Sequence, residues 1–145
     1  MKKNTINEFA MVLAAKSENE SFARQTVSAF VAQLDPTVPE LADIRTAVSE
    51  AVTNCIIHGY RGVKTNCTIY ITAKLFSDRS LSIKIRDKGC GIENIEQCRQ
   101  PLYTTDPGGE RGGMGFVIME SFCDRIRVHS VPGKGTTVTL YKKFS

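Results

Sequence analysis

Residues 67–87 read CTIYITAKLFSDRSLSIKIRD, and this stretch decides the fold class. On both sides of the polar run Ser77–Ser80, apolar residues stand at every second position, with threonine, tyrosine, serine or lysine between them. A period of two places the apolar side chains on one side of a β-strand. The stretch therefore predicts an antiparallel hairpin with one buried face.

The same alternation predicts further strands at both ends of the chain. Apolar residues at 126, 128, 138 and 140 flank a Pro-Gly-Lys-Gly turn at 132–135, which indicates a second hairpin. Residues 7–15 are predicted to form another strand, with Phe9, Met11 and Leu13 on one face. Because their neighbours are also apolar, a helix remains an alternative for this segment.

Three helices are predicted from a period near 3.6. The first follows Ser17–Glu20, which fits a capping box, and ends at Asp35-Pro36. The second begins near Pro39, which suits a first helical turn, and runs to Gly59. The third covers 114–123. Helices on one face of a mixed, mostly antiparallel sheet make a two-layer α/β (α+β) sandwich.

Composition bounds the class of protein. A chain of 145 residues predicts a single domain, 1–145. The net charge is +4, but no Lys/Arg block exceeds two residues, so binding to nucleic acid has little support. The five cysteines form no CxxC pair, which favours free thiols in a reducing cytosol. No apolar stretch has the length of a membrane span, so we expect a cytoplasmic protein without membrane contact.

The second predicted helix carries a polar series at a spacing of four residues. Glu50, Asn54 and His58 fall within an arc of about 80°. A solvated polar face would explain them, but Ala47 and Ile57 share that side, which suits a pocket floor better. An Asn oxygen can complete a Mg²⁺ shell made otherwise of waters and phosphate oxygens. Glu50, one turn away, can accept a proton from an attacking hydroxyl.

Two glycine-rich segments follow. Asp87, Gly89 and Gly91 end the first hairpin. A carboxylate there can accept a hydrogen bond from the amino group of adenine, while guanine would present an acceptor. Glycines let the backbone approach a flat ligand, although a simple turn would use the same residues.

The second glycine segment is Arg111-Gly-Gly-Met-Gly-Phe116, at the start of the third helix. Free amides and the positive end of a helix dipole favour an anion, and Arg111 can meet a terminal phosphate. A flexible helix start is the plainer alternative. The irregular stretch before it is longer than most loops, which is typical of lids and binding elements.

The three segments together predict a site for Mg-ATP and transfer of its phosphate. The chain has neither a Walker A motif nor the glycine loop and His-Arg-Asp set of protein kinases. It also lacks the βαβ pattern of a dinucleotide fold.

In this order, the motifs resemble those of the GHKL ATPase/kinase superfamily. Glu50–Gly59 resembles its N box, Asp87–Gly91 its first glycine box, Gly113–Gly115 its second, and Gly135-Thr136 its last Gly-Thr pair. The resemblance implies the Bergerat (GHKL, HATPase) fold, ATP, ADP and Mg²⁺ as ligands, and a lid at about 92–115.

Within that superfamily, the chain is most similar to the anti-sigma kinases of endospore-forming bacteria. The similarity lies in Asn19–Arg24, Phe30–Pro36, Ser49–Asn54, Ile57–Tyr60, Arg99–Leu102 and Gly113–Phe116. It implies a homodimer that inhibits sporulation sigma factor F and phosphorylates a serine of an anti-anti-sigma factor.

The resemblance also implies a role for each matching residue. Glu50 is the catalytic base, Asn54 the Mg²⁺ ligand, and Arg24 part of the partner-binding surface. The nucleotide-binding residues that it implies are Asn54, His58, Asp87, Gly89, Gly91, Thr104, Thr105, Arg111, Gly113, Met114, Gly115, Phe116 and Thr136.

Two other functions stay open at this point. A related stress-response anti-sigma kinase would share the chemistry but bind another sigma factor. A sequestering module would bind nucleotide with negligible turnover, but such a module needs no carboxylate near the terminal phosphate, so Glu50 argues against it. A sensor histidine kinase is disfavoured, since only His58 and His129 are present and no dimerisation helix pair fits the length.

Overall fold

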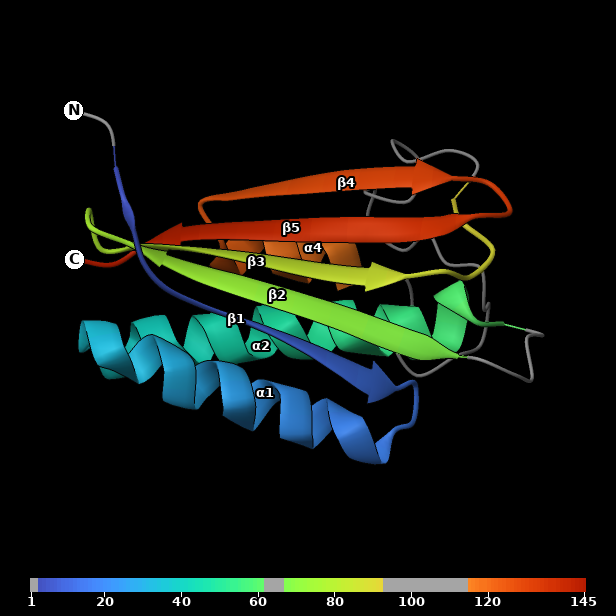
Figure 1. Cartoon of the computed structure of the whole chain (residues 1–145), viewed down its shortest axis with the longest axis horizontal. Helices are drawn as coiled ribbons and strands as arrows, with labels where there is room; N and C mark the ends of the chain where they lie inside the picture. The colour runs from blue at the N-terminus through green and yellow to red at the C-terminus, as the bar shows by residue number, and fades with distance from the viewer. Residues whose placement is uncertain (1–2, 62–66, 93–114) are drawn as a thin grey trace.

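The computed structural model describes residues 3–61, 67–92 and 115–145 (Figure 1). Five strands form one sheet in the order β1-β2-β3-β5-β4, and each neighbouring pair is antiparallel. The mostly antiparallel sheet of the predicted sandwich is thus confirmed, and every described pairing has that direction. The strands are β1 (Thr5–Ala14), β2 (Thr68–Phe76), β3 (Ser80–Asp87), β4 (Arg125–Val131) and β5 (Gly135–Lys143).

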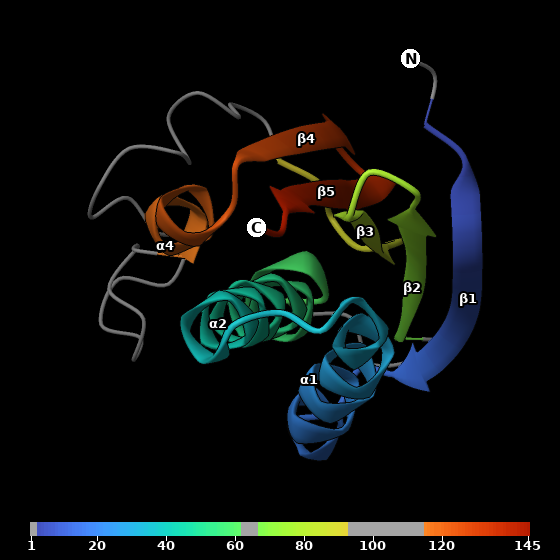
Figure 2. The ribbon, with the colours of Figure 1, turned by 90° about the vertical axis from the view of Figure 1, so that its left-hand side faces the viewer.

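The described helices cover one face of this sheet and leave the other open (Figure 2). They are α1 (Glu18–Val31), a 3₁₀ turn η1 (Ala32–Leu34), α2 (Val38–Asn54), a π-helical turn η2 (Cys55–Gly59) and α4 (Gly115–Phe122). This arrangement confirms the two-layer sandwich. No described helix is long and apolar enough to cross a membrane.

The alternation in β2 and β3 fills the core between the layers. Ile69, Ile71, Ile83 and Ile85 are fully buried, and they pack with apolar residues of the helices. The alternate residues of the same strands lie on the open face, where lysine, arginine and threonine predominate. Burial on one side only is what the period of two predicts.

The start of α1 corrects one prediction. Ser17 precedes α1 but its side chain makes no cap hydrogen bond, because Ser17 already has helical angles (φ −55°, ψ −35°) instead of the extended geometry that a capping side chain needs. The side chain of Glu20 turns to α2 instead and accepts a hydrogen bond from Thr53 Oγ1 at 3.0 Å.

A capping box is present at the start of α2. Thr37 accepts from the Glu40 amide, and the Glu40 carboxylate accepts from the Thr37 amide. Pro39 lies in the first turn as predicted. At its other end, α2 stops at Asn54 and the chain continues through the wider turn η2 to Gly59, where a continuous α-helix was expected.

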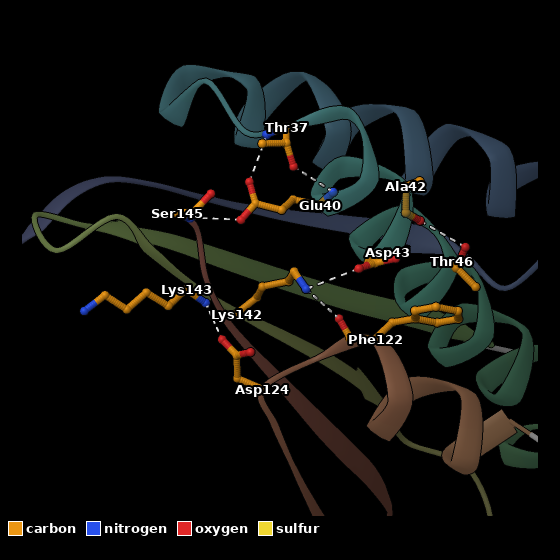
Figure 3. Close-up of polar contacts among 10 residues, drawn as sticks. All are labelled: Thr37, Glu40, Ala42, Asp43, Thr46, Phe122, Asp124, Lys142, Lys143 and Ser145. Atoms are coloured by element: carbon orange, nitrogen blue, oxygen red, sulfur yellow. Dashed lines mark hydrogen bonds and ion pairs between the residues drawn. The ribbon is translucent and has the colours of Figure 1, made fainter.

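The end of β5 and the residues after it tie the sheet to α2 (Figure 3). The Lys142 ammonium lies 3.5 Å from Asp43 of α2 and donates to the Phe122 carbonyl at 3.0 Å, at the end of α4. The Ser145 amide donates to the Glu40 carboxylate at 2.9 Å. These contacts hold the C-terminal segment, α2 and α4 in one arrangement.

Candidate nucleotide-binding site

The Asp87 carboxylate lies at the end of β3, beside η2. Its side chain is buried, and Oδ1 accepts a hydrogen bond from the Gly89 amide at 2.9 Å. The buried Cys55 thiol hydrogen-bonds to the same carboxylate. Burial raises the pKa of the Asp87 carboxyl, which these hydrogen bonds partly offset.

Glycine is required on both sides of this carboxylate. A Cβ on Gly59 would lie 2.7 Å from Asp87 Oδ2, and a Cβ on Gly89 would lie 1.7 Å from the Gly59 carbonyl oxygen. The Cys90 amide donates to that carbonyl at 2.7 Å. These close backbone contacts join the Asp87 loop to η2, and the predicted approach of the glycine backbone to a flat ligand stays a prediction.

Gly91 continues the loop with φ +76°. A Cβ there would meet the Val131 carbonyl oxygen at 2.3 Å, and the Gly133 amide donates to the Cys90 carbonyl at 2.6 Å. The loop is thus packed against the turn between β4 and β5.

Glu50 and Asn54 lie one turn apart near the end of α2. Glu50 is 3% exposed, and Asn54 is partly exposed. A Cβ on Gly115, the first residue of α4, would lie 3.0 Å from both Nδ2 and Oδ1 of Asn54. The structure thus brings the polar end of α2 against the start of α4, two segments that are about 60 residues apart in the sequence.

His58 lies in η2, beyond the end of the α-helix. Because η2 is wider than an α-helix, the angular offset from Glu50 that α-helical spacing predicts does not apply to His58. Its carbonyl accepts from the Cys90 thiol at 3.2 Å, which gives His58 a backbone role in holding the Asp87 loop.

A hollow of about 490 Å³ opens between α1 and α2, with Glu50 in its lining. It is lined by Glu20, Arg24, Ala42, Arg45, Thr46, Ser49 and Glu50. Arg24 lies there with a hydrogen bond to Ser49 Oγ at 3.3 Å and an ion pair to Glu20 at 3.7 Å. The predicted partner-binding residue and the predicted base therefore border one hollow.

Thr136 pairs with Asp87 in the β3–β5 register, which brings the last Gly-Thr motif to the first glycine box. Its hydroxyl lies 2.8 Å from Ser130 Oγ, and that oxygen accepts from the Ile92 amide at 2.7 Å. Ser130 was not predicted, because its position in an alternating strand is typical of a surface residue.

The other predicted site residues divide into two groups. Phe116 packs partly buried against the core at the start of α4. Thr104, Thr105, Arg111, Gly113 and Met114, and with them most of the expected lid, lie outside the described residues.

Residues 13–142 match the family model of the histidine kinase-like ATPase domain. An anti-sigma F factor of Shouchella clausii is 56% identical over 96% of this chain and 94% of that protein. The chain belongs to the anti-sigma F factor family of histidine kinase-like ATPases. The anti-sigma F factor of Clostridium acetobutylicum is 53% identical over 96% of this chain and 95% of that protein. The anti-sigma F factor of Geobacillus thermodenitrificans is 55% identical over 94% of this chain and 92% of that protein.

Solved structures agree on the fold of this family member. The RsbU and RsbW domains of Rv1364c from Mycobacterium tuberculosis match with a TM-score of 0.69 at 21% identity, over 95% of this chain and 32% of that one. The histidine kinase domain of the blue-light-activated kinase EL346 from Erythrobacter litoralis matches with a TM-score of 0.58 at 15% identity, over 86% and 60%.

Proposed function

We propose that this chain is an anti-sigma factor that binds and inhibits sporulation sigma factor F, and an ATP-dependent kinase that phosphorylates a serine of its anti-anti-sigma factor. The observation that carries the proposal is the position of Glu50. It is buried one turn before an amide side chain that meets the start of α4, and it borders the hollow that contains Arg24.

The described residues fit a nucleotide with Mg²⁺. Gly115 leaves room for the Asn54 amide that a Cβ would take, and Asp87 offers a buried acceptor. Asn54 Oδ1 would hold the metal and Asp87 would accept from the adenine amino group. Bound Mg-ATP supplies the phosphate to be transferred, with part of its charge neutralised by the metal.

The chain's own residues then account for the acceptor side. A serine that enters the hollow between α1 and α2 reaches Glu50, whose carboxylate takes the proton from the hydroxyl. Arg24 and Arg45 line the same hollow with Glu20 and Glu50, so its charges balance and it suits a polar segment around that serine. Arg24 lines this hollow and is partly exposed, which supports its proposed role in binding partners.

The remaining parts of the proposal rest on the family. We infer a single nucleotide-binding domain over 1–145, a lid at about 92–115, a cytoplasmic homodimer, and exchange between ATP and ADP. A mass measurement in solution tests the dimer, because one chain has a mass of 16.0 kDa.

Transfer of labelled phosphate from ATP to an anti-anti-sigma protein tests the kinase. We expect label on a serine of that protein, dependent on Mg²⁺ and lost in Glu50→Gln, while this variant still binds ATP and sigma factor F. Glu18→Gln, which changes an exposed carboxylate in the first turn of α1, is the matched control and should keep wild-type transfer.

Two outcomes would contradict the proposal. Wild-type transfer by Glu50→Gln would remove the base from its role. Absence of transfer with ATP and sigma factor still bound would make the chain a sequestering module.

A further inference from the structure

Tyr60 is buried at the end of η2, with 6% of its surface exposed. Its amide closes the π turn by donating to the Cys55 carbonyl at 3.0 Å. Its hydroxyl donates to the carbonyl of Thr68, the first residue of β2, and accepts from the Lys88 amide at 2.9 Å. One hydroxyl therefore joins the end of η2, the start of β2 and the residue after β3.

The Lys88 amide belongs to the peptide unit that directly follows Asp87. In the next peptide unit, the Gly89 amide donates to Asp87 Oδ1. The Tyr60 hydroxyl thus restricts rotation of the peptide on which the position of the carboxylate depends. In the neighbouring register, Ile69 of β2 pairs with Asp87 itself, so the bond to Thr68 anchors the hydroxyl on the strand beside the carboxylate.

The space around the carboxylate makes this restriction consequential. Gly59 lies close enough that a single added carbon would be 2.7 Å from Oδ2. A rotation of the Asp87–Lys88 peptide would move the carboxylate within this confined space, and its direction toward a ligand would change.

We propose that Tyr60 is a positioning residue that holds Asp87 for adenine and thereby sets the preference of the site for ATP over GTP. The inference rests on the proposed function and adds a determinant of base selectivity to it. Adenine presents an amino donor where guanine presents a carbonyl acceptor. A fixed carboxylate accepts a hydrogen bond from the adenine amino group and repels the guanine carbonyl. A displaced carboxylate discriminates less between the two bases.

The chemistry of the phenol suits this role. Burial raises the pKa of the Tyr60 hydroxyl, so it stays protonated and keeps donating to Thr68 at neutral pH. Phenylalanine keeps the ring and its packing but leaves the Lys88 amide and the Thr68 carbonyl without this partner.

The test compares Mg-ATP and Mg-GTP dissociation constants for the full chain and for Tyr60→Phe, both corrected to the folded fraction. We expect ATP affinity to fall about 10-fold and GTP affinity to change less than about 2-fold, so the ATP preference falls about 10-fold. Tyr141→Phe is the matched control, because Tyr141 lies on the open face of the sheet. The Arg125 guanidinium carbon lies 4.4 Å from the centre of the Tyr141 ring. The preference of this variant should equal that of the wild type.

A second measurement needs no nucleotide. Hydrogen exchange of the Lys88 amide should become faster in Tyr60→Phe by about 10-fold or more, while the amides of Ile83 and Ile85 within β3 stay as in the wild type. This readout separates the loss of one local bond from a general loss of stability.

The possible results are distinguishable. If the wild-type chain prefers ATP and Tyr60→Phe has the same preference, the role of Tyr60 is overturned and the proposed function stands. The same follows if Tyr60→Phe loses equal affinity for ATP and GTP, or if the exchange rate of its Lys88 amide is unchanged. A wild-type chain that binds neither nucleotide would overturn the proposed function, and the selectivity role with it.

Discussion

At the scale of single residues, Gly59 shows how tightly the Asp87 carboxylate, which we propose to read the base, is held. A Cβ added at Gly59 has no room, because the three nearest atoms, all within 3.0 Å, belong to the Asp87 carboxyl group. Gly59 also has its carbonyl occupied by the Cys90 amide, so the backbone there has little freedom to move away. A side chain at this position must therefore displace Asp87 itself.

Gly59→Ala is expected to weaken Mg-ATP binding by about 10-fold or more and to destabilise the fold by about 1–3 kcal/mol, the usual cost of overpacking. Titration with ATP and urea unfolding measure the two effects. Gly133→Ala is the control, because its Cβ would meet nothing within 4 Å although its φ is +80°. That variant should lose about 1 kcal/mol through backbone strain and keep wild-type ATP affinity. Equal ATP affinity in both variants would contradict the assignment of Asp87.

At the scale of elements, Glu40 connects the start of α2 to the C-terminal segment. Its carboxylate accepts from the amides of Thr37 and Ser145, and these hydrogen bonds lower its pKa from 4.5 to about 2 (Figure 3). A carboxyl whose pKa is lower in the folded state stabilises the fold above its unfolded pKa. That contribution is lost as the pH falls from about 4.5 toward 2.

Glu40→Gln should therefore lower the melting temperature at pH 7 by roughly 2–6 °C, since it removes a charged cap. The difference from the wild type should shrink below pH 4.5 and disappear near pH 2. Melting curves across this pH range provide the measurement. Glu8→Gln changes an exposed carboxylate 4.0 Å from Lys74 on the open face and should have little effect at any pH. A pH-independent difference for Glu40→Gln would show that its charge is not the cause.

The Lys142 side chain links β5 to α2 and to α4. It is 11% exposed and contacts Asp43 of α2 and the last carbonyl of α4, at Phe122. Lys142→Met keeps most of the length but leaves both acceptors without their partner, so we expect a loss of about 1–3 kcal/mol and faster amide exchange in α4. Lys143→Met is the control, because the backbone amide of Lys143, which the substitution retains, is what bonds to Asp124. Equal stability of the two variants would mean that Lys142 does not anchor α4.

The elements also show what sequence reasoning can reach. Both hairpins were predicted because a sheet with one buried face repeats every second residue, as in Ile69 and Ile71. The capping box at Ser17 was wrong because Ser17 has helical angles and the Glu20 side chain bonds to Thr53, a tertiary contact that no local pattern reports. The π turn after Asn54 was also missed, because its residues suit an α-helix equally well.

At the scale of the whole molecule, the sandwich brings together motifs that are distant in the chain. The end of α2 meets the start of α4 through Asn54 and Gly115, and the end of β3 meets η2 through Asp87 and Gly59. Spacing along the sequence predicted candidate site residues, which stay a prediction, but it could not predict these contacts, because they depend on how the helices lie on the sheet (Figure 2). A ligand that joins the motifs must therefore stabilise both layers together.

Binding of Mg-ATP should raise the stability of the entire chain. At a concentration about 100-fold above its dissociation constant, a ligand that binds only the folded state adds about 2.7 kcal/mol. For a chain of 145 residues this corresponds to a rise in melting temperature of roughly 5–10 °C. Asn54→Ala, tested at the same ATP and Mg²⁺ concentrations, should lose most of this rise, because the metal would have no protein ligand. Two results would contradict this: a full rise in melting temperature in Asn54→Ala, or an equal rise in the wild type when Mg²⁺ is chelated. Either would show that the nucleotide is bound without the metal and that the Asn54 amide contacts α4 for structural reasons alone.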